Sequence, residues 1–185
     1  MGSKKEKQIE RSKDAITTAL IELLNNYSIE QITITQLCSR AGVGRPTFYR
    51  HFDSKKDVLA QQNQKWFNEY LEKARAAYEE NPSAEIMELI AFEFYRDHEH
   101  VMNLVKTKNF YRYGVAAIAS QRRRVEKEFP LFNDKNPYER EYRIGGLIFV
   151  FSRWISGGMK ESPEEMAAIF SQIYDGMRQD SNNKA

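Results

Sequence analysis

The chain has 185 residues, 41% hydrophobic and 29% charged, which suits one large domain or a small head on a larger body. Its formal net charge of +2 is too small to indicate a nucleic-acid partner by itself. The single cysteine, Cys38, excludes an internal disulfide framework. No secretory signal is visible, and no apolar run approaches the ~20 residues of a membrane-spanning helix. We therefore expect a cytoplasmic protein that does not enter the membrane.

The charge is unevenly distributed. Residues 1–60 contain ten Lys and Arg against seven Asp and Glu, whereas residues 61–185 contain eighteen against nineteen. A mildly basic first third indicates an anionic partner at that end. The basic residues of the start (Lys4, Lys5, Lys7 and Arg11) are either a solvated helix start or an additional contact to that partner.

Apolar residues recur at helical spacing throughout, and no alternating strand pattern persists. The sequence therefore predicts an all-α chain of about nine helices. The first helix covers about residues 5–26, and two short helices lie between residues 33 and 52. The others are expected at about residues 54–80, 82–97, 101–106, 110–128, 137–157 and 163–178.

Prolines mark several of these helix starts. Pro82, Pro137 and Pro163 each follow a residue with a capping side chain, which predicts that each proline occupies the first helical position. Glu165, three residues after Ser162, completes a capping box for the last helix.

Residues 33–52 have the spacing of a helix-turn-helix. Thr33 followed by Gln36 predicts a capping box for an eight-residue helix, with Cys38 as a small core residue. Gly42 ends that helix at a sharp turn. A second short helix then begins around Gly44, with Pro46 tolerated in its first turn.

The second short helix has two different sides. Phe48 and Phe52 anchor one of them. The other carries hydrogen-bond donors and stacking groups: Arg45, Thr47, Tyr49 and Arg50. Arginine contacts guanine bidentately, and hydroxyl groups reach phosphates or bases. The alternative is an ordinary amphipathic hairpin with a solvated polar face.

A resemblance favours the DNA-binding interpretation. Residues 43–52, Val-Gly-Arg-Pro-Thr-Phe-Tyr-Arg-His-Phe, followed by Ser-Lys-Lys-Asp-Val-Leu at 54–59, resemble the signature of TetR-family repressors, and the similarity covers about residues 9–60. It implies that Thr33 and Thr35 cap the first short helix and touch phosphate. It implies that Arg45 and Thr47 face bases or backbone, and that Tyr49 and Lys55 clamp phosphates. The predicted DNA-binding residues are Thr33, Thr35, Arg45, Pro46, Thr47, Tyr49, Arg50 and Lys55.

Pro46 departs from the family pattern, because small residues are common at this position. The resemblance also implies a DNA-binding head at residues 1–53 and an effector-binding and dimerisation body at 54–178. The polar composition of residues 179–185 predicts a disordered tail.

The last two predicted helices are strongly apolar, and the first of them is apolar nearly all round. A two-fold four-helix bundle would cover such surfaces, as the family resemblance also implies. The predicted dimer interface comprises Phe151, Ile155, Met166, Ile169, Phe170, Ile173 and Tyr174. The alternative is that this stripe packs within one chain.

Aromatic side chains are frequent in the body. They fit a pocket for an apolar or planar effector, and equally an ordinary core with bulky residues. The predicted pocket comprises Phe67, Tyr70, Phe92, Tyr95, Phe110, Tyr113, Tyr142 and Trp154.

The sequence thus predicts a transcriptional regulator, a repressor that binds a palindromic operator as a homodimer under control of a small-molecule effector. The alternative is a protein co-regulator bound to the same body, because residues 153–166 resemble a Gram-positive-type subgroup of TetR-like regulators. An enzyme is not expected. The chain has three histidines, one cysteine and no glycine-rich phosphate loop, and it predicts neither a metal site nor a cofactor.

Overall fold

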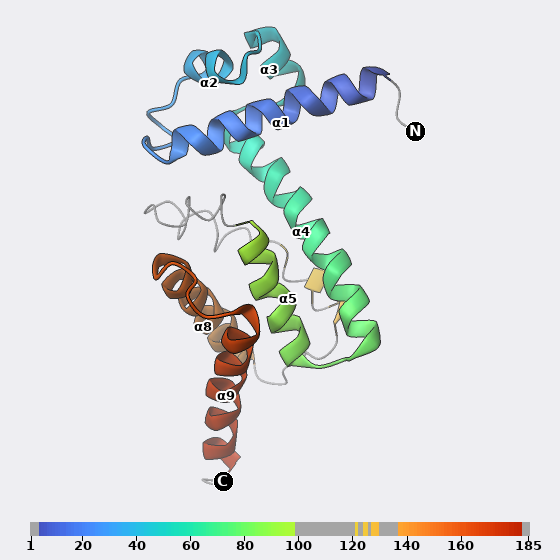
Figure 1. The fold of residues 1–185 in the computed structure, drawn as a ribbon, viewed down its shortest axis with the longest axis vertical. Helices are drawn as coiled ribbons and strands as arrows, with labels where there is room; N and C mark the ends of the chain where they lie inside the picture. Colours follow the sequence, from blue (N-terminus) through green and yellow to red (C-terminus); the bar gives the residue numbers. More distant parts are fainter. Residues whose placement is uncertain (1–3, 99–120, 122–123, 126, 130–136, 183–185) are drawn as a thin grey trace. The chain divides into compact units, whose positions relative to one another are not determined.

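The computed structural model describes residues 4–98, 121, 124–125, 127–129 and 137–182, and within these the chain is all-α (Figure 1). The helices are α1 (Lys4–Leu24), α2 (Ile34–Ala41), α3 (Arg45–His51), α4 (Lys55–Glu80), α5 (Ala84–Asp97), α8 (Pro137–Ser156) and α9 (Pro163–Asn182). This confirms the predicted fold class. The helix expected at 101–106 and most of the one at 110–128 lie outside the described residues.

The chain divides into two compact units, Met1–Trp66 and Phe67–Ala185. The division falls inside α4, later than the predicted boundary at residue 53. The first turns of α4 belong to the first unit because they are hydrogen-bonded to α1 and to the end of α3.

In the first unit, α1 lies across α2 and α3 (Figure 1). Apolar residues four apart on α1, Ile16 and Leu20, are fully buried. They share the core with Leu37 of α2, Phe48 of α3 and Val58 of α4, which are also inaccessible to solvent. Cys38 is buried as predicted. Each short helix therefore contributes one apolar side to a common core and leaves its other side open.

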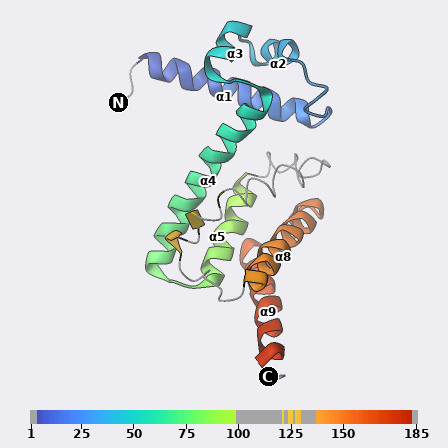
Figure 2. The ribbon, with the colours of Figure 1, turned by 180° about the vertical axis from the view of Figure 1, so that it is seen from behind.

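In the second unit, α5 packs against α9, and α8 also contacts α9 (Figure 2). One core cluster joins the end of α4 to α5 through Leu71, Ala74 and Met87, with Phe129 completing it. Phe92 of α5 is fully buried between Phe151 and Trp154 of α8, with ring centroids 4.2 and 5.4 Å away.

The predicted helix starts have different outcomes. At α8, Pro137 is the first helical residue as predicted, and the expected capping residue Asn136 lies outside the described residues. At α9 the Ser162 N–H donates to Glu165 Oε2 (2.7 Å) and the Glu165 N–H donates to Ser162 Oγ (3.2 Å), so the capping box is confirmed. At α5 the prediction is wrong, because Pro82 precedes the helix. Ser83 is the cap, and its hydroxyl accepts from the Ile86 N–H (3.2 Å).

The end of α9 also differs from the prediction. The helix continues to Asn182, beyond the expected end at residue 178 and into the segment predicted to be disordered. No proline or helix-ending glycine follows Gly176, so nothing in the chain stops the helix there. Residues 183–185 lie outside the described residues.

None of the described helices has the length and apolar character needed to cross a membrane.

Candidate nucleic-acid interface

The start of α2 is fixed by the predicted capping box. The Gln36 N–H donates to Thr33 Oγ1 (3.1 Å), and the Thr33 N–H donates to Gln36 Oε1 (2.9 Å). Two of the amides that a helix start leaves unpaired are therefore satisfied by these two residues alone. Thr33 and Thr35 are both exposed at this end of α2.

The turn between α2 and α3 depends on Gly42. Its φ of 64° lies in the left-handed region, where an L side chain is strained. The Gly42 N–H donates to the Ser39 carbonyl (3.3 Å) and the Val43 N–H donates to the Cys38 carbonyl (3.0 Å), which closes the end of α2. The predicted glycine turn is confirmed.

The helix α3 presents an open polar side. Pro46 lies in its first turn, as predicted, and Phe48 holds the helix to the core. The Tyr49 ring packs edge-on against Phe48 (5.2 Å), which orients a side chain that is half exposed. The polar side comprises the exposed Arg45, Pro46, Tyr49 and Arg50 and the half-buried Thr47.

The two arginines of α3 are exposed, and their ion pairing differs from that of the arginine in α2. Among the described residues, no carboxylate forms an ion pair with Arg45 or Arg50. Arg40 of α2 differs, because its Nε donates to Glu22 Oε2 of α1 at 2.7 Å. The open side of α3 therefore presents two guanidinium groups to an anionic partner, whereas the guanidinium group of Arg40 in α2 is already paired with Glu22.

His51 ends α3 and feels the same positive charge. Its pKa is lowered from the ordinary value, first by burial and then by the charges of Lys13 and Arg50. Its imidazole is therefore neutral at neutral pH, and its backbone carbonyl accepts a hydrogen bond from Gln61 Nε2 (3.2 Å).

Lys55 lies where α4 begins, and its contacts are not those of a free phosphate ligand. Its half-buried side chain donates through Nζ to the backbone carbonyls of Ile29 and Ile32, in the turn that leads into α2. Sequence reasoning missed this role, because the carbonyls that meet the ammonium lie more than twenty residues away in the chain.

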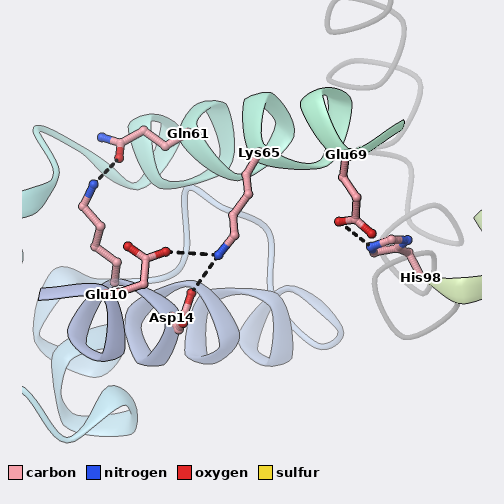
Figure 3. A network of polar contacts seen from close by, with 7 residues as sticks. Glu10, Asp14, Gln61, Lys65, Glu69 and His98 are labelled. Atoms are coloured by element: carbon pink, nitrogen blue, oxygen red, sulfur yellow. Dashed lines mark hydrogen bonds and ion pairs between the residues drawn. The ribbon is translucent and has the colours of Figure 1, made fainter. Parts of the chain in front are cut away.

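Further polar contacts tie the start of α4 to α1. Lys13 Nζ donates to Gln61 Oε1 (3.1 Å), and Lys65 Nζ forms ion pairs with Glu10 (3.1 Å) and Asp14 (3.3 Å) (Figure 3). Because Gln61 also bonds the end of α3, helices α1, α3 and the start of α4 are held in one arrangement. Sequence reasoning did not single out Gln61 or Lys65.

The residues predicted for the dimer interface fall into two groups. Phe151, Ile155, Met166 and Phe170 are buried within the chain, while Ile169 and Ile173 are exposed. The side chain of Tyr174 is outside the described residues. A second exposed group was not in the predicted set: Tyr138, Tyr142 and Phe149 lie four and seven residues apart along α8, on one side of that helix.

Five of the eight predicted pocket residues belong to one run of ring contacts, which we call the aromatic run. Its centroid distances are Phe67–Tyr70 6.1 Å, Tyr70–Phe94 5.9 Å, Phe94–Tyr95 6.1 Å, Tyr95–Phe151 4.4 Å, Phe151–Phe92 4.2 Å and Phe92–Trp154 5.4 Å. Tyr142 is exposed on α8, and Phe110 and Tyr113 lie outside the described residues.

Two half-buried tyrosines of the aromatic run have raised pKa values. Burial raises the pKa of Tyr95 to about 12. Burial also raises the pKa of Tyr70, as do Tyr95 and Glu88, whereas the Arg143 charge lowers it. Both phenols are therefore neutral hydrogen-bonding groups near neutral pH.

Two short helices are joined by a glycine turn, packed against a third helix, and carry two exposed arginines that form no ion pair with the described residues. This arrangement defines a helix-turn-helix DNA-binding protein. The family comparison agrees. Residues 16–61 match the model described as "Bacterial regulatory proteins, tetR family", and residues 84–176 match a transcriptional regulator C-terminal region. The chain belongs to the TetR family of transcriptional regulators.

Solved structures show the same fold. A TetR transcriptional regulator from Streptococcus agalactiae is similar with a TM-score of 0.70 and 19% identity, over 92% of this chain and 97% of that one. The fatty acid degradation regulator FadR from Bacillus halodurans is similar with a TM-score of 0.64 and 17% identity, over 89% and 93%. A comparison with curated proteins gave no match.

Proposed function

We propose that this protein is a repressor that binds a palindromic operator as a homodimer, with α3 of each subunit in the major groove. The observation that carries the proposal is the open side of α3, where Arg45 and Arg50 are exposed and unpaired among the described residues. Because such a regulator acts on the chromosome, we also propose that the protein is located in the cytoplasm.

The geometry of α3 suits this role. The first residues of a recognition helix enter the groove, and Arg45 is the first residue of α3. Thr33 and Thr35 at the start of α2, together with Tyr49, are exposed, and we assign to them the phosphate contacts that fix the register. We assign base recognition to Arg45 and Thr47, with Pro46 beside them and Arg50 adding charge.

The test is to select bound duplexes from a random pool and to measure the affinity for the selected site. We expect a two-fold palindrome, with strong loss of binding by the variant Arg45→Ala/Arg50→Ala. Arg40→Ala is the matched control, because it removes one exposed guanidinium that is already paired with Glu22. Failure to select any common sequence, or equal losses from the control, would remove α3 from the interface.

The proposed dimer uses the exposed apolar residues of the second unit. Tyr138, Tyr142 and Phe149 of α8 and Ile169 and Ile173 of α9 are large hydrophobic side chains in water. Large apolar side chains exposed on a monomer mark an interaction surface, and a two-fold dimer would cover the same residues on both subunits.

We further propose that a small apolar or aromatic molecule controls operator binding through the aromatic run. The tilted and edge-on rings of this run would offer dispersion contacts to a planar ligand, and the neutral hydroxyls of Tyr70 and Tyr95 with the Arg143 charge would offer polar ends. For release of DNA, the effector must bind better to the state that does not fit the operator.

The effector test uses the fluorescence of Trp154, which ends the aromatic run. The variant Trp66→Phe leaves Trp154 as the single tryptophan of the chain. We expect active compounds to change its emission and to lower the affinity for operator DNA. Operator DNA is then expected to lower the affinity for the compound by the same factor. If a broad compound panel changes neither property while a purified protein partner alters operator affinity, the body is a docking surface for a co-regulator.

A further inference from the structure

The segment that leads into α2 is a short helical turn. The Gln31 and Ile32 N–H groups both donate to the Ser28 carbonyl (3.1 and 3.3 Å), and the Ser28 N–H donates to Gln31 Oε1 (2.8 Å). The side chains of Ile29 and Ile32 are buried in the first unit. As at any helix end, the last carbonyls of this turn have no amide partner further along the turn.

Lys55 supplies the missing donors. Its half-buried ammonium bonds the carbonyls of Ile29 and Ile32 at once. A cation is favoured where carbonyls end a helical turn and is disfavoured at a helix start such as that of α4. Lys56, the next residue, is exposed.

Thr33, the cap of α2, follows Ile32 directly. A side chain that holds the Ile32 carbonyl therefore fixes where α2 begins, and with it the position of Thr33 and Thr35. Two bonds to carbonyls also leave the Lys55 ammonium with only one further proton to offer.

We propose that Lys55 is a positioning residue that holds the entry to α2 against α4, and that it does not clamp a DNA phosphate. This replaces the phosphate role that the family resemblance implies, and it rests on the proposed function, in which α2 and α3 bind the operator.

Lysine footprinting of the wild-type protein is the first test. The protein is treated with an acetylating reagent with and without operator DNA, and modification is quantified by mass spectrometry. Lys55 is expected to react much more slowly than Lys56 in the free protein, and DNA is expected to change its rate little. A Lys55 that reacts like Lys56 without DNA and becomes protected only when DNA is added overturns the proposal.

The second test compares Lys55→Met with the matched control Lys56→Met, which removes the same charge from the next, exposed position. Lys55→Met is expected to lower the thermal midpoint by several degrees relative to the control, because two carbonyls lose their donor. It is also expected to weaken operator binding by about tenfold, since the entry to α2 must be ordered on binding.

The salt dependence of binding separates positioning from a phosphate contact. Loss of one phosphate contact flattens the plot of log affinity against log salt by about 0.9. The plot for Lys55→Met is expected to have the same slope as the plot for Lys56→Met. The proposal is overturned if the slope for Lys55→Met is flatter than that for Lys56→Met by this amount and the thermal midpoints of the two variants are equal. If the wild-type protein binds no DNA sequence, the proposed function fails, while the footprint of the free protein and the thermal midpoints still test the contact of Lys55 with the turn.

Discussion

Arg45 and Tyr49 differ in what they can recognise, although both lie on the open side of α3. Arg45→Ala is expected to relax sequence preference at one position in each half-site, with a loss of ~1–3 kcal/mol there. Tyr49→Phe removes one hydroxyl group and is expected to weaken all sequences to a similar extent. Binding curves on the selected operator and on duplexes with single base-pair changes measure both effects.

Tyr49→Phe is the internal control of this comparison, since it keeps the ring that packs against Phe48. An Arg45→Ala protein that discriminates between bases as well as the wild type does would show that Arg45 bonds only the backbone.

His51 makes the stability of the first unit depend on pH. Its folded-state pKa is lower than the ordinary value of about 6.5, first through burial and then through Lys13 and Arg50. The folded state thus favours the neutral imidazole. The contribution of His51 to stability is therefore complete when the pH is above the ordinary pKa. It is lost as the pH falls from the ordinary pKa through the lower folded-state pKa.

The variant His51→Gln stays neutral at every pH and tests this effect. Between about pH 8 and about pH 5.5 the wild-type thermal midpoint is expected to fall further than that of the variant. Equal falls in the two proteins would show that protonation of His51 does not affect stability.

At the scale of helices, the cap of α2 gives a direct stability prediction. Thr33→Ala removes the side-chain oxygen that accepts from the Gln36 N–H. It is expected to lower the free energy of unfolding by ~1 kcal/mol, within the 0.5–2 kcal/mol usual for such caps. Urea denaturation of the two proteins measures the difference.

Thr35→Ala is the matched control for the cap. Thr35 is exposed within α2 and alanine is the better helix former, so no loss of stability is expected. Both substitutions remove a hydroxyl from the proposed DNA-facing side, so only the stability measurement separates the capping role. A Thr35→Ala loss as large as that of Thr33→Ala would contradict it.

Local rules predicted most helices well. The boxes at Thr33 and Ser162, the turn at Gly42 and the first turn of α3 each depend on residues within five positions of one another. The start of α5 was misplaced because Asn81 and Ser83 both offer capping side chains around Pro82, and only the folded chain shows that Ser83 is the cap.

Contacts between distant residues could not be predicted in this way. Nothing near Lys55 in the chain indicates the carbonyls that it bonds, and Lys65 meets Glu10 only because α4 returns past α1 within the first unit. The assignment of Phe151 and Ile155 to the interface came from a helix that is apolar nearly all round. Periodicity cannot tell which side of such a helix α5 covers.

At the scale of the whole molecule, the exposed side of α8 makes a prediction about assembly. Phe149→Glu places a carboxylate on the proposed dimer surface, so two unpaired charges would be buried in each proposed dimer, at a cost of several kcal/mol. Sedimentation is expected to show monomers, with operator affinity greatly reduced. Ile169→Glu is expected to act in the same direction.

Lys160→Glu, an equally acidic change at an exposed position between α8 and α9, is the control and is expected to remain dimeric. Phe170 is unsuitable for this test because it is buried within the chain, where a charge would unfold the protein instead. A Phe149→Glu protein that stays dimeric would place the interface away from this side of α8.

The proposed dimer surface on α8 also has a consequence for gene dosage. When subunits must pair before they can occupy a palindrome, mass action makes the amount of active protein vary with the square of the chain concentration, below the dissociation constant of the dimer. A twofold change in expression then changes operator occupancy by up to fourfold. The same equilibrium makes the melting temperature rise with protein concentration. Phe149 and its neighbours would thus set the expression level at which the regulated gene changes state.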